Sequence, residues 1–189
     1  MVVRRRAKAY SKRKPVVNTR KSKKTQFSFV KAVPSQKIVK FIMGDIKGFE
    51  QGKYPIKISL STEENIQIRD VALESGRQSL TKGLTKVFQK NFFLRCHPYP
   101  HNILRNNRVY SGGSKGERIQ TGMSKSFGTP EGRAAILRTG DPIFSAYFLG
   151  QENIPKVRAF FKSTAPKLPC KSRIVVEIPK GLIPVEIVE

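Results

Sequence analysis

The sequence contains no apolar run long enough to cross a membrane. The most apolar candidate, from Ile143 to Leu149, is only as long as a β-strand, whereas a membrane span needs roughly 18 apolar residues. The first ten residues, MVVRRRAKAY, lack the apolar stretch of a secretory signal. We therefore expect neither a membrane protein nor a secreted one.

Cysteine is scarce, with two residues in the chain. Cys96 and Cys170 do not have the C-x-x-C spacing of a zinc site or a redox pair. A disulfide between them is one alternative, although a reducing compartment favours two free, mostly buried thiols. His97 follows Cys96 directly, but adjacent residues of a strand point to opposite faces. We therefore expect packing rather than a catalytic cysteine.

Histidine is equally scarce, and its two copies do not make a metal site. His97 and His101 are four residues apart, which would place them on one face of a helix. The prolines between them prevent that helix, and no cysteine or acid nearby completes a ligand set. We expect no metal and no cofactor.

Acidic residues are absent from the first 44 positions, which hold 14 of the 37 basic residues. The remainder has 23 basic residues against 13 acidic ones, and the whole chain carries a net charge of +24. A surplus of this size indicates a polyanionic partner. A long block of like charge repels itself and is extended when free, either as a solubilising tail or as an anion-binding arm. We therefore expect a basic RNA-binding arm over residues 1–30 and a single basic domain over residues 31–189.

Hydrophobic periodicity predicts a mixed α and β domain. Alternating apolar residues predict strands at 56–60, 92–96, 134–137, 143–149 and 174–178. Ser61 and Glu64 form a capping box, which predicts a helix from about Thr62 to Gln89. A shorter helix follows Asn153 and ends at Pro166. The pattern is typical of an α+β two-layer sandwich, with an antiparallel or mixed sheet packed against two helices.

The long predicted helix carries glycines on its apolar face. Helical spacing brings six residues onto one side: Leu73, Gly76, Leu80, Gly83, Leu84 and Val87. Each glycine costs a helix about 1 kcal/mol relative to alanine, so a close neighbour is expected there. We expect that neighbour to be the sheet. The acids Glu63 and Glu64 suit the start of this helix electrostatically and need no catalytic explanation.

A long glycine-rich and basic segment interrupts the domain from Asn106 to Gly122. Its Gly112–Gly116 run resembles a phosphate-binding loop but lacks the G-x-x-x-x-G-K-[ST] spacing, so nucleotide hydrolysis is not predicted. Long loops inside compact domains are usually functional or disordered. We interpret this segment as an internal functional loop.

Four segments together resemble a known family. They read IQIRDVALESGR at 66–77, HPYPHNILRNN at 97–107, ERIQTGMSKSFGTPEGRA at 117–134 and KLPCKSRIVVE at 167–177. In this order they resemble the universal large-subunit ribosomal protein family called sixteen in bacteria and ten-e in archaea. The resemblance covers roughly 31–178. It departs in the loop, where Lys115-Gly116-Glu117-Arg118 stands in place of the usual Gly-Ala-Asp-Arg run, and in the arm, which matches only through Arg6, Lys8 and Tyr10.

The resemblance implies a place in the large subunit between its large rRNA and 5S rRNA, beside the aminoacyl-tRNA site. It also implies a loop directed toward the peptidyl transferase centre, neighbouring ribosomal proteins as partners, and a location in the cytoplasm on the ribosome. The short C-terminus resembles archaeal rather than eukaryotic members. In this reading the protein is not an enzyme, because the rRNA carries the chemistry.

The residues expected to contact RNA are basic or aromatic, since cations neutralise phosphates and planar rings stack on bases. For each the alternative is a packed or solvated side chain. They are Arg4, Arg5, Arg6, Lys8, Lys12, Arg13, Lys14 and Arg20 in the arm, Tyr99, His101 and Arg105 around the turn, Arg108, Lys115 and Arg118 in the loop, and Lys125 and Arg133 after it.

Two other functions compete with a structural rRNA-binding protein. An RNA-modifying enzyme would need an acid, a cysteine or a cofactor loop in a cleft, and the sequence shows no such constellation. A free nucleic-acid chaperone or DNA-compacting protein is suggested by charge alone. Co-sedimentation with large subunits separates it from a ribosomal protein.

Overall fold

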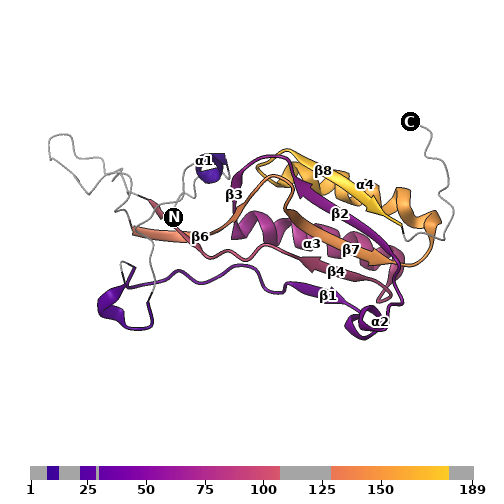
Figure 1. Ribbon diagram of the computed structural model, residues 1–189, viewed down its shortest axis with the longest axis horizontal. Helices are drawn as coiled ribbons and strands as arrows, with labels where there is room; N and C mark the ends of the chain where they lie inside the picture. The colour runs from indigo at the N-terminus through magenta and orange to yellow at the C-terminus, as the bar shows by residue number, and fades with distance from the viewer. Residues whose placement is uncertain (1–7, 13–21, 29, 107–128, 179–189) are drawn as a thin grey trace, which may run out of the picture.

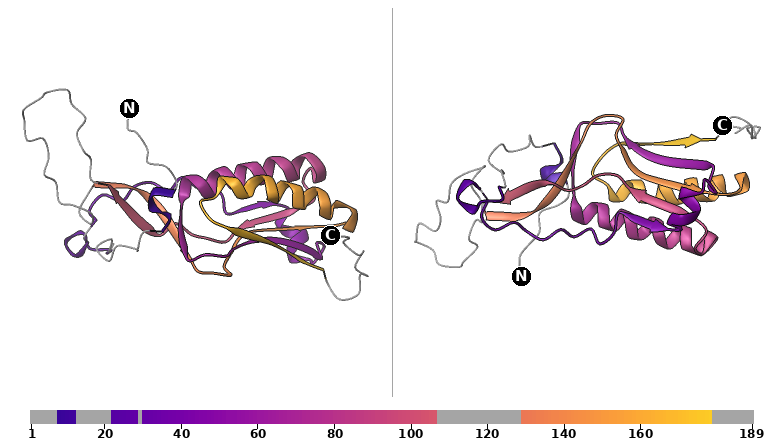
Figure 2. Two further views of the ribbon diagram at one scale, coloured as in Figure 1. Left: turned by 90° about the horizontal axis from the view of Figure 1, so that it is seen from above. Right: turned by 60° about the horizontal axis from the view of Figure 1, so that its bottom comes forward.

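The computed structural model describes residues 8–12, 22–28, 30–106 and 129–178 (Figure 1). Its main sheet has five antiparallel strands in the order β1-β4-β7-β2-β8. Their bounds are β1 Ile42–Gly44, β2 Ile56–Thr62, β4 Phe93–Cys96, β7 Pro142–Phe148 and β8 Ser172–Glu177. Helices α3 (Asp70–Phe88) and α4 (Ile154–Thr164) lie together on one face of this sheet (Figure 2). The predicted α+β sandwich is confirmed.

The core lies between this sheet and the two helices. Ile56, Ile58 and Leu60 alternate along β2 as predicted, and each is at most 1% exposed. They form one cluster with side chains of α3 and α4, among them Leu80 and Phe161. Burial of apolar area at about 25 cal/mol per Å² is the main force holding the two layers together.

The glycines of α3 mark close contacts, but with two different neighbours. A Cβ on Gly76 would lie 3.0 Å from the ring of Phe144 in β7, so the sheet approaches there as predicted. A Cβ on Gly83 would lie 3.0 Å from the ring of Phe160, which belongs to α4. The expectation of a sheet neighbour is therefore wrong at Gly83, where helix packs on helix.

A second sheet, which the sequence did not predict, stands beside the sandwich. It contains β3 (Ile66–Arg69), β6 (Thr129–Leu137) and β5 (Asn102–Asn106), in the antiparallel order β3-β6-β5. It lies at one end of the molecule, on the left in Figure 1. Its strands β5 and β6 lead into and out of the internal segment expected to be a functional loop. Of that segment, 107–122 lies outside the described residues.

The long helix begins at Asp70, not at Thr62, so the predicted helix start is wrong. Ile66 and Ile68 instead alternate along β3, and they pair with Leu137 and Ala135 of β6. The Thr62 hydroxyl accepts from the Glu64 backbone N–H at 3.3 Å and closes a turn between β2 and β3. Ser61, the first residue of the capping-box pattern, lies in β2 instead, because pairing with distant strands outweighs a local helix signal.

The remaining elements are short. Asn153 precedes α4 as predicted, but its side-chain amide donates to the Leu149 carbonyl at 3.4 Å instead of capping the helix. Gly140 has φ +93° in the predicted turn between β6 and β7. Two short α-helices and three short 3-10 helices complete the described elements: α1 Lys8–Ser11, α2 Ile46–Glu50, η2 Thr25–Phe27, η3 Gln151–Asn153 and η4 Ala165–Lys167.

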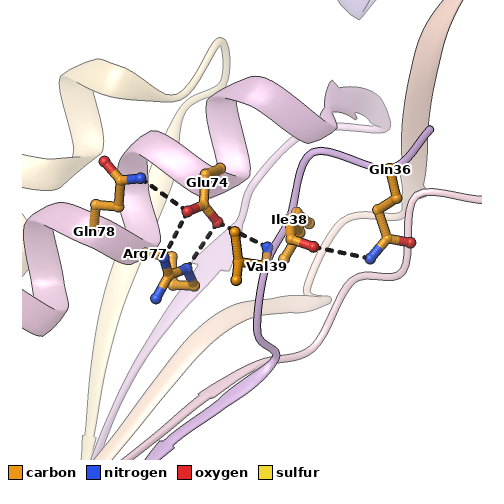
Figure 3. A network of polar contacts seen from close by, with 6 residues as sticks. All are labelled: Gln36, Ile38, Val39, Glu74, Arg77 and Gln78. Carbon is orange, nitrogen blue, oxygen red and sulfur yellow. Dashed lines mark hydrogen bonds and ion pairs between the residues drawn. The ribbon is translucent and has the colours of Figure 1, made fainter. Parts of the chain in front are cut away.

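The carboxylates of α3 hold the segment that precedes β1. The Lys37 backbone N–H donates to Asp70 Oδ2 at 3.1 Å, and the Val39 N–H donates to Glu74 Oε2 at 3.3 Å. Glu74 also accepts from Arg77 and Gln78 on the next turn of the helix (Figure 3). Segment 36–39 is therefore fixed along α3 by charge-assisted hydrogen bonds from its backbone.

Candidate nucleic-acid interface

The first described part of the basic arm is packed on the fold. Tyr10 of α1 is 2% exposed and lies with Leu104 and Ala134 in a small apolar cluster on the second sheet. Its hydroxyl donates to Glu131 Oε2 at 2.8 Å, and the Arg69 guanidinium carbon lies 5.4 Å from its ring centroid. Charge alone predicted an extended arm. For α1 that expectation is wrong, because an aromatic side chain finds a buried site.

Backbone and amide groups add to this attachment. Gln67 Nε2 donates to the Tyr10 carbonyl at 2.8 Å, and Asn102 Nδ2 donates to Gln67 Oε1 at 2.9 Å. Both bonds are buried, which makes each partner costly to remove. They connect α1 to β3 and β5, so the arm enters the fold beside the strands that flank the internal segment.

Several predicted RNA-contact residues lie on the surface of the described chain. Tyr99 is 55% exposed, and its ring stacks on Phe41 with centroids 5.7 Å apart. His101 is exposed, with Nδ1 3.2 Å from the Tyr99 carbonyl oxygen. Lys12 is exposed at the end of α1. An exposed aromatic ring can stack on a base, and an exposed lysine can bind phosphate.

The predicted residues of the second sheet are less accessible. Arg105 in β5 and Arg133 in β6 are partly buried. Arg133 Nε donates to the Pro34 carbonyl at 2.8 Å, which links β6 to the segment before β1. Lys8 begins α1. The other predicted contacts lie outside the described residues: Arg4, Arg5, Arg6, Arg13, Lys14, Arg20, Arg108, Lys115, Arg118 and Lys125.

A basic group that we did not predict lies on the sheet face away from the helices. Arg95 in β4 is exposed, and His97 follows it with Nε2 2.8 Å from Ser145 Oγ. Burial first, and then the charges of Arg95 and Lys57, lower the pKa of His97 below its usual range. The strand alternation that placed Leu94 and Cys96 inward could have revealed Arg95, because the residue between them must point outward.

Both cysteines are free thiols, as expected. Burial raises the pKa of Cys96 to about 12 and also raises that of Cys170. Cys170 lines a surface hollow of about 890 Å³ with Glu63 and Glu64, and no histidine is among the described residues of its wall. A neutral thiol without a base is not an activated nucleophile.

The described part of the chain offers neither a cluster of metal ligands nor a membrane-spanning helix. Within 8–12, 22–28, 30–106 and 129–178, no three His, Cys, Asp or Glu side chains gather as a metal site would require. None of the helices in those ranges is long and apolar enough to span a bilayer.

Comparison with known proteins gives one consistent family. Residues 15–175 match the family described as Ribosomal protein L16p/L10e. The chain is 39% identical over 158 residues to the large ribosomal subunit protein uL16 of Pyrobaculum arsenaticum, covering 83% of this chain and 85% of that protein. It is 33% identical over 177 residues to the uL16 protein of Methanoculleus marisnigri, covering 93% of this chain and 97% of that protein. This chain therefore belongs to the L16p/L10e family of ribosomal proteins.

Proposed function

We propose that this chain is a structural protein of the large ribosomal subunit that binds large-subunit rRNA and acts on the ribosome in the cytoplasm. The family match over residues 15–175 carries this proposal, because it spans both the sandwich and the second sheet. The relatives named above are archaeal large-subunit proteins, so the chain is of the archaeal type. Members of this family are structural components, not enzymes.

The physical properties of the described surface support RNA as the partner. The net charge of +24 favours a polyanion, and lysine and arginine bind phosphates without reading sequence. The exposed Tyr99 ring offers a platform for an unpaired base. Neighbouring ribosomal proteins are the other expected partners.

The finer part of the proposal concerns 5S rRNA and tRNA. The resemblance implies that the internal segment points toward the peptidyl transferase centre and that the protein lies beside the aminoacyl-tRNA site. The packing of Tyr10 on the second sheet supports this, because it brings the arm to the same end of the molecule as β5 and β6. The arm and the internal segment can then bind RNA at this end of the molecule, while the sandwich is bound at another place in the subunit.

Co-sedimentation tests the main proposal. A lysate of cells that express the tagged chain is separated on a sucrose gradient at a magnesium concentration that splits the two subunits. The chain should follow the large-subunit peak in a near one-to-one ratio and stay there after a moderate salt wash. A chain found only at the top of the gradient, or in much less than one copy per subunit, would favour a free chaperone or a modifying enzyme instead.

A further inference from the structure

The main sheet has one face that neither α3 nor α4 covers; we call it the helix-free face, although the short helix α2 packs at one end of it. Residues that alternate with the core positions point to this helix-free face, and α3 and α4 both lie on the opposite side (Figure 2). The strand residues that define it are Ile42 and Gly44 in β1, Phe93 and Arg95 in β4, Ser145 and Tyr147 in β7, Lys57, Ser59 and Ser61 in β2, and Arg173, Val175 and Glu177 in β8.

One end of the helix-free face is occupied by aromatic rings that pack on one another. Phe49 of α2 stacks on Phe93 with centroids 4.0 Å apart and planes 6° apart. Tyr147 meets the rings of Phe49 and Phe93 edge-on, at 4.8 Å and 5.7 Å. Because these rings already have partners, this sheet is not arranged to stack bases in the way that many RNA-binding sheets are.

The rest of the helix-free face is cationic. Arg95 lies in register with Ser145, Ser145 with Ser59, and Ser59 with Val175, while Arg173 opposes Ser61 one row away. The two arginines stand on strands separated by three interstrand spacings, which is about 14 Å. Small hydroxyl side chains lie between them. Ser59 and Ser145 themselves are buried, so the charged groups exposed in this part of the face are the two guanidinium groups.

The charges on this face are largely unneutralised. Glu177 is the one acid among the strand residues that define the face, and it pairs with Lys57 at 2.8 Å. Arg95 and Arg173 are exposed and make no ion pair with any described residue. Lys57 and Arg95 are close enough to His97 to disfavour its charged form, so a positive potential acts on that ring.

We propose that the helix-free face is a second contact surface for ribosomal RNA, in which Lys57, Arg95 and Arg173 bind backbone phosphates. This inference rests on the proposed function. Guanidinium groups are suited to phosphate because of their planar fork, and the absence of a free ring favours recognition of the backbone rather than of bases. The face belongs to the sandwich, whereas the internal segment assigned to tRNA leaves from the second sheet, which makes rRNA the partner here.

The test compares matched charge removals on the two sides of the molecule. The variant Arg95→Gln/Arg173→Gln removes two charges from the helix-free face. The control Lys86→Gln/Arg158→Gln removes two exposed charges from α3 and α4. Binding of each protein to protein-free large-subunit rRNA of Pyrobaculum arsenaticum is measured between 50 and 400 mM salt, about the range in which phosphate contacts dominate.

The face variant should lower the magnitude of the slope of log K against log salt by about 1.4 to 1.8, since each lost phosphate contact removes about 0.7 to 0.9. The control should keep the slope of the parent chain. The inference would be overturned, with the proposed function intact, if the face variant kept the slope of the parent chain. The same holds if the slope of the control fell by as much as that of the face variant. A parent chain that does not bind the rRNA overturns both. A loss confined to tRNA binding would reassign the face to tRNA and overturn the rRNA assignment.

Histidine NMR provides a second readout. The chain has two histidines, so the ring resonance of His97 can be assigned with a His97→Gln variant. Phosphates over Arg95 and Lys57 should raise the pKa of His97 when the rRNA fragment protected by the protein is added, and the rise should be smaller in the face variant. An unchanged pKa of His97 in the RNA-bound parent chain would contradict contact at this face.

Discussion

The hydroxyl of Tyr10 donates to Glu131 Oε2 at 2.8 Å, although 121 positions separate the two residues in the sequence. Glu131 lies in β6, the strand that follows the internal segment, and Tyr10 lies in the basic arm. The Glu131 carboxylate also faces Arg69, whose Nη2 is 3.8 Å from Oε1. One acid therefore connects the arm to the strand that follows the internal segment, the segment that we propose contacts tRNA.

Two substitutions at Tyr10 should weaken this connection and destabilise the protein by different amounts. Tyr10→Phe deletes a hydrogen bond to a carboxylate and should lower the free energy of unfolding by about 2 kcal/mol. Tyr10→Ala also removes the buried ring and should cost about 3–5 kcal/mol. Urea unfolding followed by circular dichroism measures both values. Tyr99→Phe is the control, because that side chain is 55% exposed and its variant should unfold like the parent chain. Equal stability of Tyr10→Ala and the parent chain would show that α1 is not docked in solution.

The two glycines of α3 should respond differently to alanine. Alanine favours a helix over glycine by about 1 kcal/mol, whereas overpacking a core costs about 1–3 kcal/mol. At Gly76 the new methyl group meets Phe144, which is fully buried and cannot move, so Gly76→Ala should destabilise. At Gly83 it meets Phe160, which is only partly buried and can shift, so Gly83→Ala should be near neutral. Thermal unfolding compares the pair. A larger loss at Gly83 than at Gly76 would contradict the packing described here.

Glu74 should make stability depend on pH. Its hydrogen bond to Arg77, above all, lowers the pKa of Glu74 below its ordinary value of 4.5. A depressed folded pKa stabilises the protein fully above the ordinary value, and the contribution is lost as the pH falls through the folded pKa. Glu74→Gln should therefore be less stable than the parent chain at pH 7, and the gap should narrow as the pH falls below the ordinary value of 4.5 and through the folded pKa.

Urea unfolding at pH 7, 5, 4 and 3 measures this gap. Arg77→Gln is the matched variant: without the guanidinium the folded pKa of Glu74 should lie closer to its ordinary value, so that the acid-induced loss is smaller and is complete at a higher pH than in the parent chain. A gap between Glu74→Gln and the parent chain that stays constant from pH 7 to pH 3 would show that the ion pair in Figure 3 does not contribute through charge.

Shortening the internal segment should affect function more than stability. Replacing residues 110–119 by a short Gly-Ser linker changes the length of a loop whose closure entropy varies only slowly with length, so the melting temperature should move little. Ribosomes with the shortened protein should still contain it but should bind aminoacyl-tRNA and translate less well. Reconstituted large subunits provide the measurement. Normal tRNA binding and translation with full incorporation would refute the functional assignment, and a collapsed melting temperature would place the segment in the core.

The sequence by itself determined strands β2, β4, β7 and β8 of the sandwich, the class of partner and the family, but it did not reveal β1. Alternation at Ile56, Ile58 and Leu60 is local, because successive side chains of a strand point to opposite faces whatever the rest of the chain does. Net charge is a sum over composition and needs no fold. The burial of Cys96 also followed from nearby residues, because strand alternation turns the thiol inward.

Only the tertiary structure decided which residues meet across long separations. Ile66 and Ile68 form a strand because β6, more than 60 positions later, pairs with them, and no local signal could outweigh the capping box before that pairing was known. Tyr10 is buried because Leu104 and Ala134 provide a site for its ring. Lys57, Arg95 and Arg173 gather because the strand order β4-β7-β2-β8 sets three distant segments side by side. Periodicity determines the face on which a side chain lies, whereas strand order and register, set by the packing of the whole chain, determine its neighbours.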